Sequence, residues 1–421
     1  METTPSNRDL LLRRSREAAM TCLETPPPRI GHDKKRTAAL GTESAGKTQT
    51  RMHHEATSHN PDVLVVDNGF LPATWPFLRD RLRDGFIDRD LTVRWESLTT
   101  GQHARDIPGV AETHALVVLG VEPGAADIAA LSNLMVVAGI TDGAGLAVAP
   151  QLAARGIPYV DGKRGRSHSQ AEMAILLMMA GLRQLPTWHA KMAVEGPQAW
   201  PLASWHFCDH PGYVNGTVRG KRVAVLGLDP VGMHIADLCL ALGATVVAVD
   251  PDADDIDFTV CGVQRVTLKQ VAEAAEVVVV ASGSPQLTAS QVDRLAPGSL
   301  VVTLNRTGID LSALRARVLR NELAWATDVY QDTPVPLGDP ILARDNVVHT
   351  PGVAGRTRDA NLEVADILVE NVTRVLRGGP PQPWDCIPPD RFGDDLDKSS
   401  STAVVSRDQL TVPAHDVAAT S

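Results

Sequence analysis

The stretch VAVLGLDPVG at residues 223–232 joins an apolar, β-branched run to a glycine and then to a second glycine. Apolar side chains at helical spacing follow it, at Val231, Ile235, Leu238, Cys239 and Leu242. Asp250 then closes the next strand-like run, 245–249, at the distance that a dinucleotide-binding fingerprint requires. A strand, a glycine turn, a helix, a second strand and an acidic residue in this order predict a Rossmann domain.

Each position of this turn has an expected task. Gly227 is expected to make the tight turn, and Gly232 to let helix and strand pack closely. Asp250 is expected to accept the ribose hydroxyls of an adenosine and to repel a 2'-phosphate, which favours NAD over NADP. The predicted cofactor-binding residues here are Gly227, Leu228, Asp229, Pro230, Val231, Gly232 and Asp250.

Asp229 stands where the fingerprint has its middle glycine. Its carboxylate can cap the amides of the helix that it precedes, and in that pose it lies where a phosphate would bind. Two like charges about 4 Å apart cost up to roughly 4 kcal/mol at an effective dielectric of 20. Tight NAD binding therefore requires this carboxylate to turn away, to be neutralised or to be bridged by a cation. Pro230 suits the first turn of a helix.

Strand-like and helical segments alternate along the chain, which predicts parallel sheets with helical crossovers. The strand-like runs are 63–66, 91–95, 115–119, 134–137 and 157–160, and, after a helix over about 169–182, 222–226, 245–249, 277–281, 300–304, 323–326 and 346–349. A last helix, about 361–376, is expected to return to the first sheet.

The expected fold class is therefore α/β with two doubly wound parallel sheets. A Rossmann domain, residues 166–351, is inserted in a split flavodoxin-like substrate domain, 61–165 and 352–388. The cleft between the two domains is the expected ligand site. The polar, aperiodic segments 1–60 and 389–421 are expected to be disordered.

The composition limits the possible function classes. A net charge of -10 argues against a nucleic-acid partner and against an anionic membrane surface, since both need clustered cations. The longest apolar run, 173–182, is too short to span a bilayer, and the N-terminus lacks an apolar signal segment. The five cysteines are scattered without a CxxC pair, as in a reduced cytoplasmic protein.

Several motifs in one order resemble the D-isomer-specific 2-hydroxyacid dehydrogenase family. They are LAARGIPYV at 152–160, the pair Ala171-Glu172, VRGKRVAVLG at 218–227, Asn305-Arg306-Thr307-Gly308, DVY at 328–330 and TPGVAG at 350–355. The resemblance implies an NAD-dependent enzyme that forms a homodimer and acts on a small carboxylate substrate.

The resemblance also implies roles for individual residues. The loop Gly143-Ala144-Gly145 would hold the substrate carboxylate with its amides, and Arg306 would hold the carboxylate and the carbonyl oxygen. Asn305 and Asp328 would lie among the cofactor-binding residues. The loop ASGSPQLT at 281–288 is similar to short glycine loops of other dinucleotide domains, such as adenosylhomocysteine hydrolase, and Ser282 and Gly283 would pass beneath the adenosine or ribose.

The proton-transfer pair of the family is missing. Family members have a glutamate before the first proline of 328–340 and a histidine after the Thr-Pro pair, and this chain has Thr333 and Gly352 there. Loss of an acid or base typically lowers a rate about 100- to 10,000-fold. The leading substitute is His349, although a strand side chain facing the helices is the alternative interpretation. The remaining candidates near these positions are Tyr330, Asp332, Arg356 and Arg358.

Two other patterns are weaker. His206, Cys208, Asp209 and His210 are spaced too closely for a preorganised zinc site, so we expect a loop and no metal. GTESAGKT at 41–48 fits a phosphate-binding loop, but no buried strand precedes it, and Lys47 is interpreted as a solvated charge.

Three functional hypotheses remain. The favoured one is an NAD-dependent oxidoreductase that transfers hydride to or from a 2-oxo or 2-hydroxy acid-like substrate with a non-standard acid/base. The second is a non-catalytic dinucleotide sensor or scaffold. The third is a pocket that has lost the dinucleotide and binds another small anion through Arg306.

Overall fold

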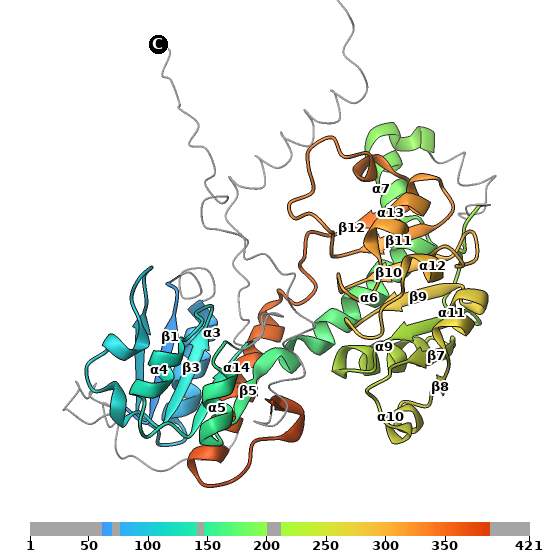
Figure 1. Ribbon diagram of the computed structural model, residues 1–421. Coiled ribbons are helices and arrows are strands. Elements are labelled where there is room, and N and C mark those ends of the chain that lie inside the picture. The colour runs from blue at the N-terminus through green and yellow to red at the C-terminus, as the bar shows by residue number, and fades with distance from the viewer. Residues whose placement is uncertain (1–60, 70–75, 141–146, 200–211, 388–421) are drawn as a thin grey trace, which may run out of the picture. The chain divides into compact units, whose positions relative to one another are not determined.

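The computed structural model describes residues 61–69, 76–140, 147–199 and 212–387 (Figure 1). The segments that we expected to be disordered, 1–60 and 389–421, lie outside these residues. The described chain contains two α/β domains, each built on its own sheet. The expected fold class is confirmed.

The first sheet has six strands in the order β13-β5-β4-β3-β1-β2. Its strands are β1 (Val63–Asp67), β2 (Val93–Ser97), β3 (Ala115–Leu119), β4 (Val136–Gly139), β5 (Tyr159–Asp161) and β13 (Cys386–Ile387). All pairs are parallel except β13 with β5. Every residue of β1, β3 and β4 is buried, because helices cover both faces of a parallel sheet.

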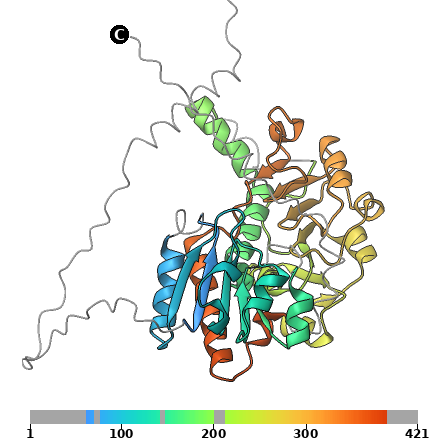
Figure 2. The same ribbon diagram turned by 60° about the vertical axis from the view of Figure 1, so that its left-hand side comes forward.

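Alternate strand residues pack against different helices. One face packs against α3 (Pro76–Ile87) and α14 (Arg358–Leu376), and the other against α4 (Ala125–Ala130) and α5 (Ala149–Arg155). The last helix therefore returns to the first sheet as predicted: α14 contacts β4 and β5, and its orange ribbon stands among the blue and cyan elements of this domain in both views (Figures 1 and 2). It begins at Arg358, where Thr357 caps it by accepting a hydrogen bond from the Ala360 amide.

The second sheet has seven parallel strands in the order β12-β11-β10-β9-β6-β7-β8. Its strands are β6 (Arg222–Leu226), β7 (Thr245–Val249), β8 (Gln264–Arg265), β9 (Val277–Val280), β10 (Leu300–Thr303), β11 (Ala324–Thr327) and β12 (Val347–His349). The chain starts at β6 in the middle, moves outward through β7 to β8, and returns to β9 on the other side. This reversal beside β6 is the switch point of a Rossmann sheet.

Helices cover both faces of this sheet as well. One face packs against α6 (Ser167–Leu182) and α9 (Pro230–Ala241), and the other against α11 (Leu268–Ala274) and α13 (Leu311–Leu319). Within the described residues, the other α-helices are α7 (Leu185–Glu195), α10 (Asp255–Val260) and α12 (Ala289–Val292). Short 3-10 helices are η1 (Ala104–Asp106), η2 (Val110–Glu112), η3 (Gly162–Arg166), η4 (Gly196–Gln198), η5 (Pro340–Ala343) and η6 (Pro383–Asp385).

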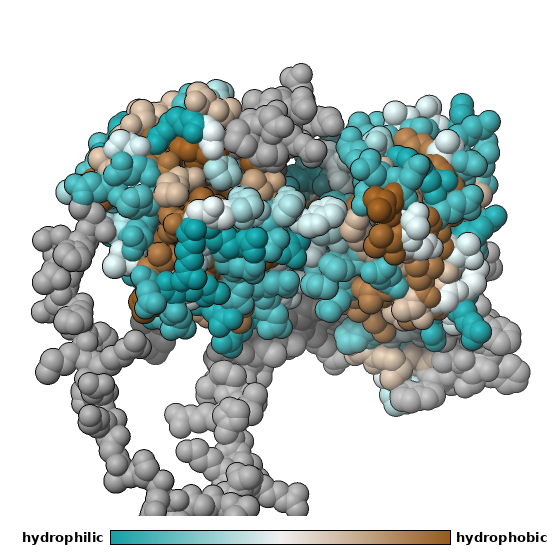
Figure 3. Space-filling view, turned by 90° about the horizontal axis from the view of Figure 1, so that it is seen from below, coloured by the Kyte–Doolittle hydropathy of each residue, from teal (hydrophilic) through white to brown (hydrophobic). Residues whose placement is uncertain are grey.

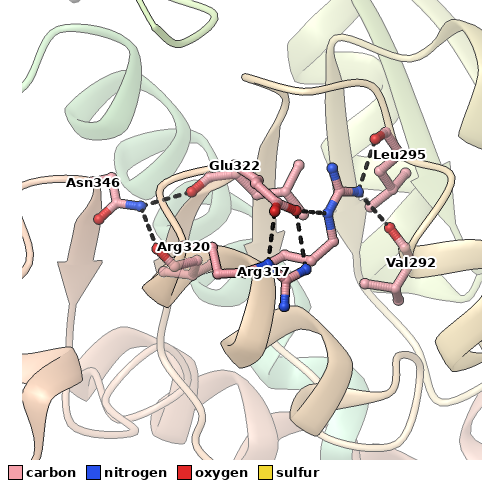
Figure 4. A network of polar contacts seen from close by, with 8 residues as sticks. Val292, Leu295, Arg317, Arg320, Glu322 and Asn346 are labelled. Carbon is pink, nitrogen blue, oxygen red and sulfur yellow. Dashed lines mark hydrogen bonds and ion pairs between the residues drawn. The ribbon is translucent and has the colours of Figure 1, made fainter.

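A buried arginine of α13, Arg317, forms hydrogen bonds with the end of α12 and the turn that follows it (Figure 4). The Arg317 side chain is 4% exposed and donates to the carbonyl oxygens of Val292 at 2.7 Å and Leu295 at 2.8 Å. Its Nε also donates to Glu322 at 2.8 Å, and Arg320 binds the same carboxylate from the surface. Hydrogen bonds from Arg320 and Arg317 lower the pKa of Glu322 to about 2.

Hydrophilic residues cover much of the described surface in the view of Figure 3, with hydrophobic areas between them. None of the helices in the described ranges is both long enough and apolar enough to cross a membrane.

Candidate functional site

The glycine turn after β6 has the geometry that the fingerprint predicts. Gly227 has φ +91, a left-handed conformation that favours glycine, and a Cβ there would come within 2.3 Å of the Ser282 Cβ. A Cβ on Gly232 would come within 1.9 Å of the Gly227 carbonyl oxygen. Each glycine is therefore required by the close approach of its neighbours, and α9 begins directly against β6.

Two carboxylates bind the amides of this turn. Asp250, just after β7, accepts hydrogen bonds from the amides of Leu228 at 2.6 Å and Asp252 at 2.8 Å. Asp229 is the N-cap of α9 and accepts from the Gly232 amide at 3.0 Å. Burial raises the pKa of Asp229, and the hydrogen bond from Gly232 opposes that rise. The capping pose considered from the sequence is the one that the structure has.

Two further loops meet the turn at the carboxyl ends of the strands. Ser282 follows β9 and touches Gly227, as described above. A Cβ on Gly283 would come within 2.5 Å of the Thr307 hydroxyl and 3.7 Å of the Asn305 side-chain oxygen. Asn305 in turn accepts from the amide and the hydroxyl of Thr307, both at 2.8 Å. The fold thus brings together the predicted cofactor-binding residues of the turn with Ser282, Gly283 and Asn305.

The glycine cradle and Asp250 fit the adenosine half of a dinucleotide. The phosphate position fits less well, because the Asp229 carboxylate already holds an amide at the helix N-terminus that would bind a phosphate.

Arg306 lies in the loop that leaves β10, directly after Asn305. Its side chain is exposed and forms no hydrogen bond or ion pair with another described residue. The carboxyl ends of parallel strands are where α/β sheets bind ligands. A planar guanidinium with free donors there can bind a carboxylate through two hydrogen bonds.

Asp328 follows β11, is 5% exposed and holds the TPGVAG segment. Its carboxylate accepts from the Thr350 hydroxyl at 2.6 Å, the Val353 amide at 2.9 Å and the Ala354 amide at 2.8 Å. The sequence placed Asp328 among the cofactor-binding residues, and the structure shows that it binds the protein's own loop.

Gly352 lies within that segment and has φ +72. A Cβ added to it would meet only the Asp328 carbonyl oxygen, at 3.8 Å. The position where the family has its histidine is therefore uncrowded, but its backbone has a conformation that residues with side chains rarely adopt. Thr333, at the position of the family glutamate, is exposed.

His349 ends β12 and forms a hydrogen-bonded pair with Tyr330 through Nδ1 and the phenol oxygen. Alternation along β12 places His349 on the same face as Val347, which packs with the α11 and α13 layer, and Tyr330 packs against that layer too. Burial lowers the pKa of His349 and raises the pKa of Tyr330. This placement favours the alternative interpretation of His349 as a strand side chain facing the helices.

Some predicted residues lie outside the described residues. They are the carboxylate loop Gly143-Ala144-Gly145, the group His206, Cys208, Asp209 and His210, and Lys47. Among described residues, no group of three or more His, Cys, Asp or Glu side chains is arranged to hold a metal ion. Arg356, two residues before α14, and Arg358, its first residue, are both exposed, and Arg358 lies over the Phe77 ring at 5.5 Å.

Two relationships were missed from the sequence. One is the Tyr330–His349 pair, although both residues were candidates. The only signal in the sequence was that the two strand-like runs 323–326 and 346–349 follow one another along the chain. In the structure they form the neighbouring strands β11 and β12, and Thr327 lies opposite His349. The other is the stack of His168 on His234, with ring centroids 3.9 Å apart, which joins α6 to α9. No sequence spacing links these two rings.

Comparison with known proteins agrees with this geometry. The family profile described as D-isomer specific 2-hydroxyacid dehydrogenase, NAD binding domain, matches residues 175–354. D-3-phosphoglycerate dehydrogenase of Archaeoglobus fulgidus is 31% identical over 233 residues, covering 54% of this chain and 42% of that protein. The enzyme of the same name from Mycobacterium tuberculosis is 27% identical over 327 residues, 76% of this chain and 57% of its own length. The chain thus spans about half the length of these relatives.

A solved structure of similar fold is the phosphoglycerate oxidoreductase from Rhizobium etli, with a TM-score of 0.62 and 17% identity over 77% of this chain and 98% of that one. At this identity the likeness concerns the fold alone. The glycine turn and the two sheets, together with the matching family profile, lead to one conclusion: residues 175–354 form an NAD-binding domain of the D-isomer-specific 2-hydroxyacid dehydrogenase family.

Proposed function

We propose that this protein is an NAD-dependent oxidoreductase that transfers hydride to or from a small 2-oxo or 2-hydroxy acid. The single observation that carries the proposal is Arg306. Its guanidinium is exposed and has no hydrogen-bond or ion-pair partner among the described residues. Arg306 lies between Asn305 and Thr307, in the loop after β10. A guanidinium in this position can bind an anionic substrate. A bound nicotinamide would supply or accept the hydride.

Arg306 would bind the substrate carboxylate and polarise the carbonyl oxygen that takes the proton. That proton would come from water, because neither Thr333 nor Gly352 can act as an acid near neutral pH. The uncrowded position at Gly352 supports this route, since a Cβ there would have only one neighbour, at 3.8 Å. Asp250 supports a preference for NAD over NADP, because its carboxylate would repel the 2'-phosphate of NADP.

Steady-state kinetics with NADH and with NADPH over a panel of 2-oxo acids test this proposal. The wild-type chain is expected to turn over at least one of these acids, and more readily with NADH. Arg306→Gln is expected to lower kcat/KM about 100-fold, the size of losing a charge-stabilising donor. Arg294→Gln is the matched control, since Arg294 is also exposed and its side chain has no described partner. It should stay within about twofold of wild type.

A second candidate function is a non-catalytic dinucleotide sensor or scaffold. The left-handed Gly352 and the capping carboxylate of Asp229 favour it, because both depart from a working family site. Calorimetric binding of NADH without turnover of any acid in the panel would support this candidate and contradict the first.

The assembly that we propose is a homodimer in the cytoplasm. Exposed apolar side chains on α6 and at the start of α7 support a partner surface, with Leu176 and Leu185 each 55% exposed and Met179 42%. The free thiols of Cys239, Cys261 and Cys386 suit a reducing compartment. Light scattering after size exclusion would decide the assembly, with a mass of one chain contradicting it.

A further inference from the structure

The protein itself uses two of the backbone amides between residues 228 and 232. The Leu228 amide donates to Asp250, and the Gly232 amide donates to Asp229. The amides of Asp229 and Val231 donate no hydrogen bond to another described residue. Pro230 has no amide hydrogen to give. The carboxylates of Asp229 and Asp250 therefore already hold two of the amides of this turn.

A dinucleotide requires those same donors. The pyrophosphate of NAD binds at the N-terminus of the helix that follows the glycine turn, where amide hydrogens and the helix dipole attract an anion. The Asp229 carboxylate is an anion held at 3.0 Å from the Gly232 nitrogen. It therefore competes with a pyrophosphate both for the hydrogen bonds and by charge repulsion.

We propose that Asp229 is an affinity-determining residue, an internal competitor for the pyrophosphate of a dinucleotide. The inference rests on the proposed function, because it supposes that this site takes a nicotinamide dinucleotide. It predicts that dinucleotides bind weakly and assigns that weakness to the Asp229 side chain. Compounds with a pyrophosphate must displace the carboxylate from α9 before they can bind fully.

The effect should be confined to ligands that carry phosphate. Asp250 accepts from Leu228 and Asp252 on the β7 side of the turn, and the close neighbours of Gly227 and Gly232 do not include the side chain of Asp229. Adenosine would use only this part of the site. The affinity for adenosine therefore distinguishes a change at the phosphate position from a change in the whole fold.

The experiment uses the full chain and calorimetry with NADH, ADP-ribose and adenosine. Asp229→Ser removes the charge and keeps a good N-cap, while Asp229→Gly restores the glycine of the fingerprint at the cost of a weaker cap. Both variants are expected to bind NADH and ADP-ribose at least about tenfold more tightly than wild type, with adenosine binding unchanged. Having two variants keeps the test decisive if one of them folds poorly.

Asp310→Ser is the matched control. Asp310 caps α13 by accepting from the Ala313 amide at 2.9 Å, and α13 packs on the opposite face of the sheet from α9. Its replacement loses the same charge at the same kind of helix position, and it should leave NADH, ADP-ribose and adenosine binding as in wild type.

Each other outcome overturns the inference. If wild type binds NADH and the Asp229 variants bind it no more tightly, the carboxylate is not the competitor, and the proposed function stands. If adenosine binding tightens in parallel, Asp229 acts through the fold. If neither wild type nor the folded variants bind NADH, the inference and the proposed function both fail.

Discussion

The carboxylate of Asp328 accepts a hydrogen bond from the backbone amide of Ala354 across 2.8 Å. The same carboxylate holds the Val353 amide and the Thr350 hydroxyl. A side chain at the end of β11 therefore fixes the segment around Gly352, the position where the family has its histidine. The backbone of that segment is set by a buried, hydrogen-bonded carboxylate.

Replacing Asp328 is expected to destabilise the protein strongly. Asp328→Ala removes three hydrogen bonds to a charged group and leaves two amides without their acceptor. At roughly 1.5–3 kcal/mol for each such bond, and allowing for relaxation, the free energy of unfolding should fall by about 3 kcal/mol. Urea denaturation measures it. Asp332 is exposed, and its carboxylate forms no hydrogen bond with another described residue. The free energy of unfolding of Asp332→Ala should therefore stay within about 0.5 kcal/mol of wild type. Equal losses in the two variants would show that Asp328 does not fix the loop.

Restoring the family residues is not expected to restore the family's proton transfer. Gly352→His places a side chain on a left-handed backbone, at a cost of roughly 1–2 kcal/mol. We expect that variant, alone or with Thr333→Glu, to be less stable than wild type by about this amount and to reduce 2-oxo acids no faster. Gly352→Asn should cost less, because asparagine tolerates this conformation. A hundredfold gain in kcat for the double variant would contradict the prediction.

Acid is expected to weaken the contact between Tyr330 and His349. Burial lowers the pKa of His349 below its ordinary value of about 6.5. The stability linked to the neutral imidazole is therefore fully present above about pH 6.5 and is lost as the pH falls toward the lower, folded-state pKa. The Tm of wild type should drop more between pH 7 and pH 5 than that of His349→Gln. Tyr330→Phe removes the hydroxyl but keeps the imidazole buried, so the Tm of this variant should fall between pH 7 and pH 5 as it does in wild type. Parallel curves for wild type and His349→Gln would exclude this linkage.

Arg317 and Arg320 bind one carboxylate, yet they should differ in their effect on stability. Arg317 is buried and donates to two carbonyl oxygens as well as to Glu322, whereas Arg320 is exposed. Arg317→Ala takes the donor away from the buried carbonyl oxygens of Val292 and Leu295 and should lower the free energy of unfolding by about 3 kcal/mol. Arg320→Ala should lower it by about 0.5 kcal/mol, as for a surface ion pair. Chemical denaturation of both variants in one buffer checks this, and a reversed order would refute the burial argument.

Much of the fold could be predicted because its signals are local. The runs 222–226 and 245–249 coincide with β6 and β7 at both ends, since short runs rich in β-branched residues are typical of strands in a parallel sheet that helices cover on both faces. Shorter elements were missed. β8 and β13 have two residues each, which is too few for a period to show in the sequence.

The sequence by itself determined the fold class, the glycine turn and the absence of the family's histidine and glutamate, because each depends on residue identity at fixed spacing. Only the tertiary structure decided what the remaining groups do. It turned Asp328 toward its own loop and paired His349 with Tyr330, and it selected the capping pose of Asp229 from the alternatives that the sequence left open. Hydrogen-bond partners far apart in the chain are chosen by strand order and burial, and these arise only when the whole domain folds.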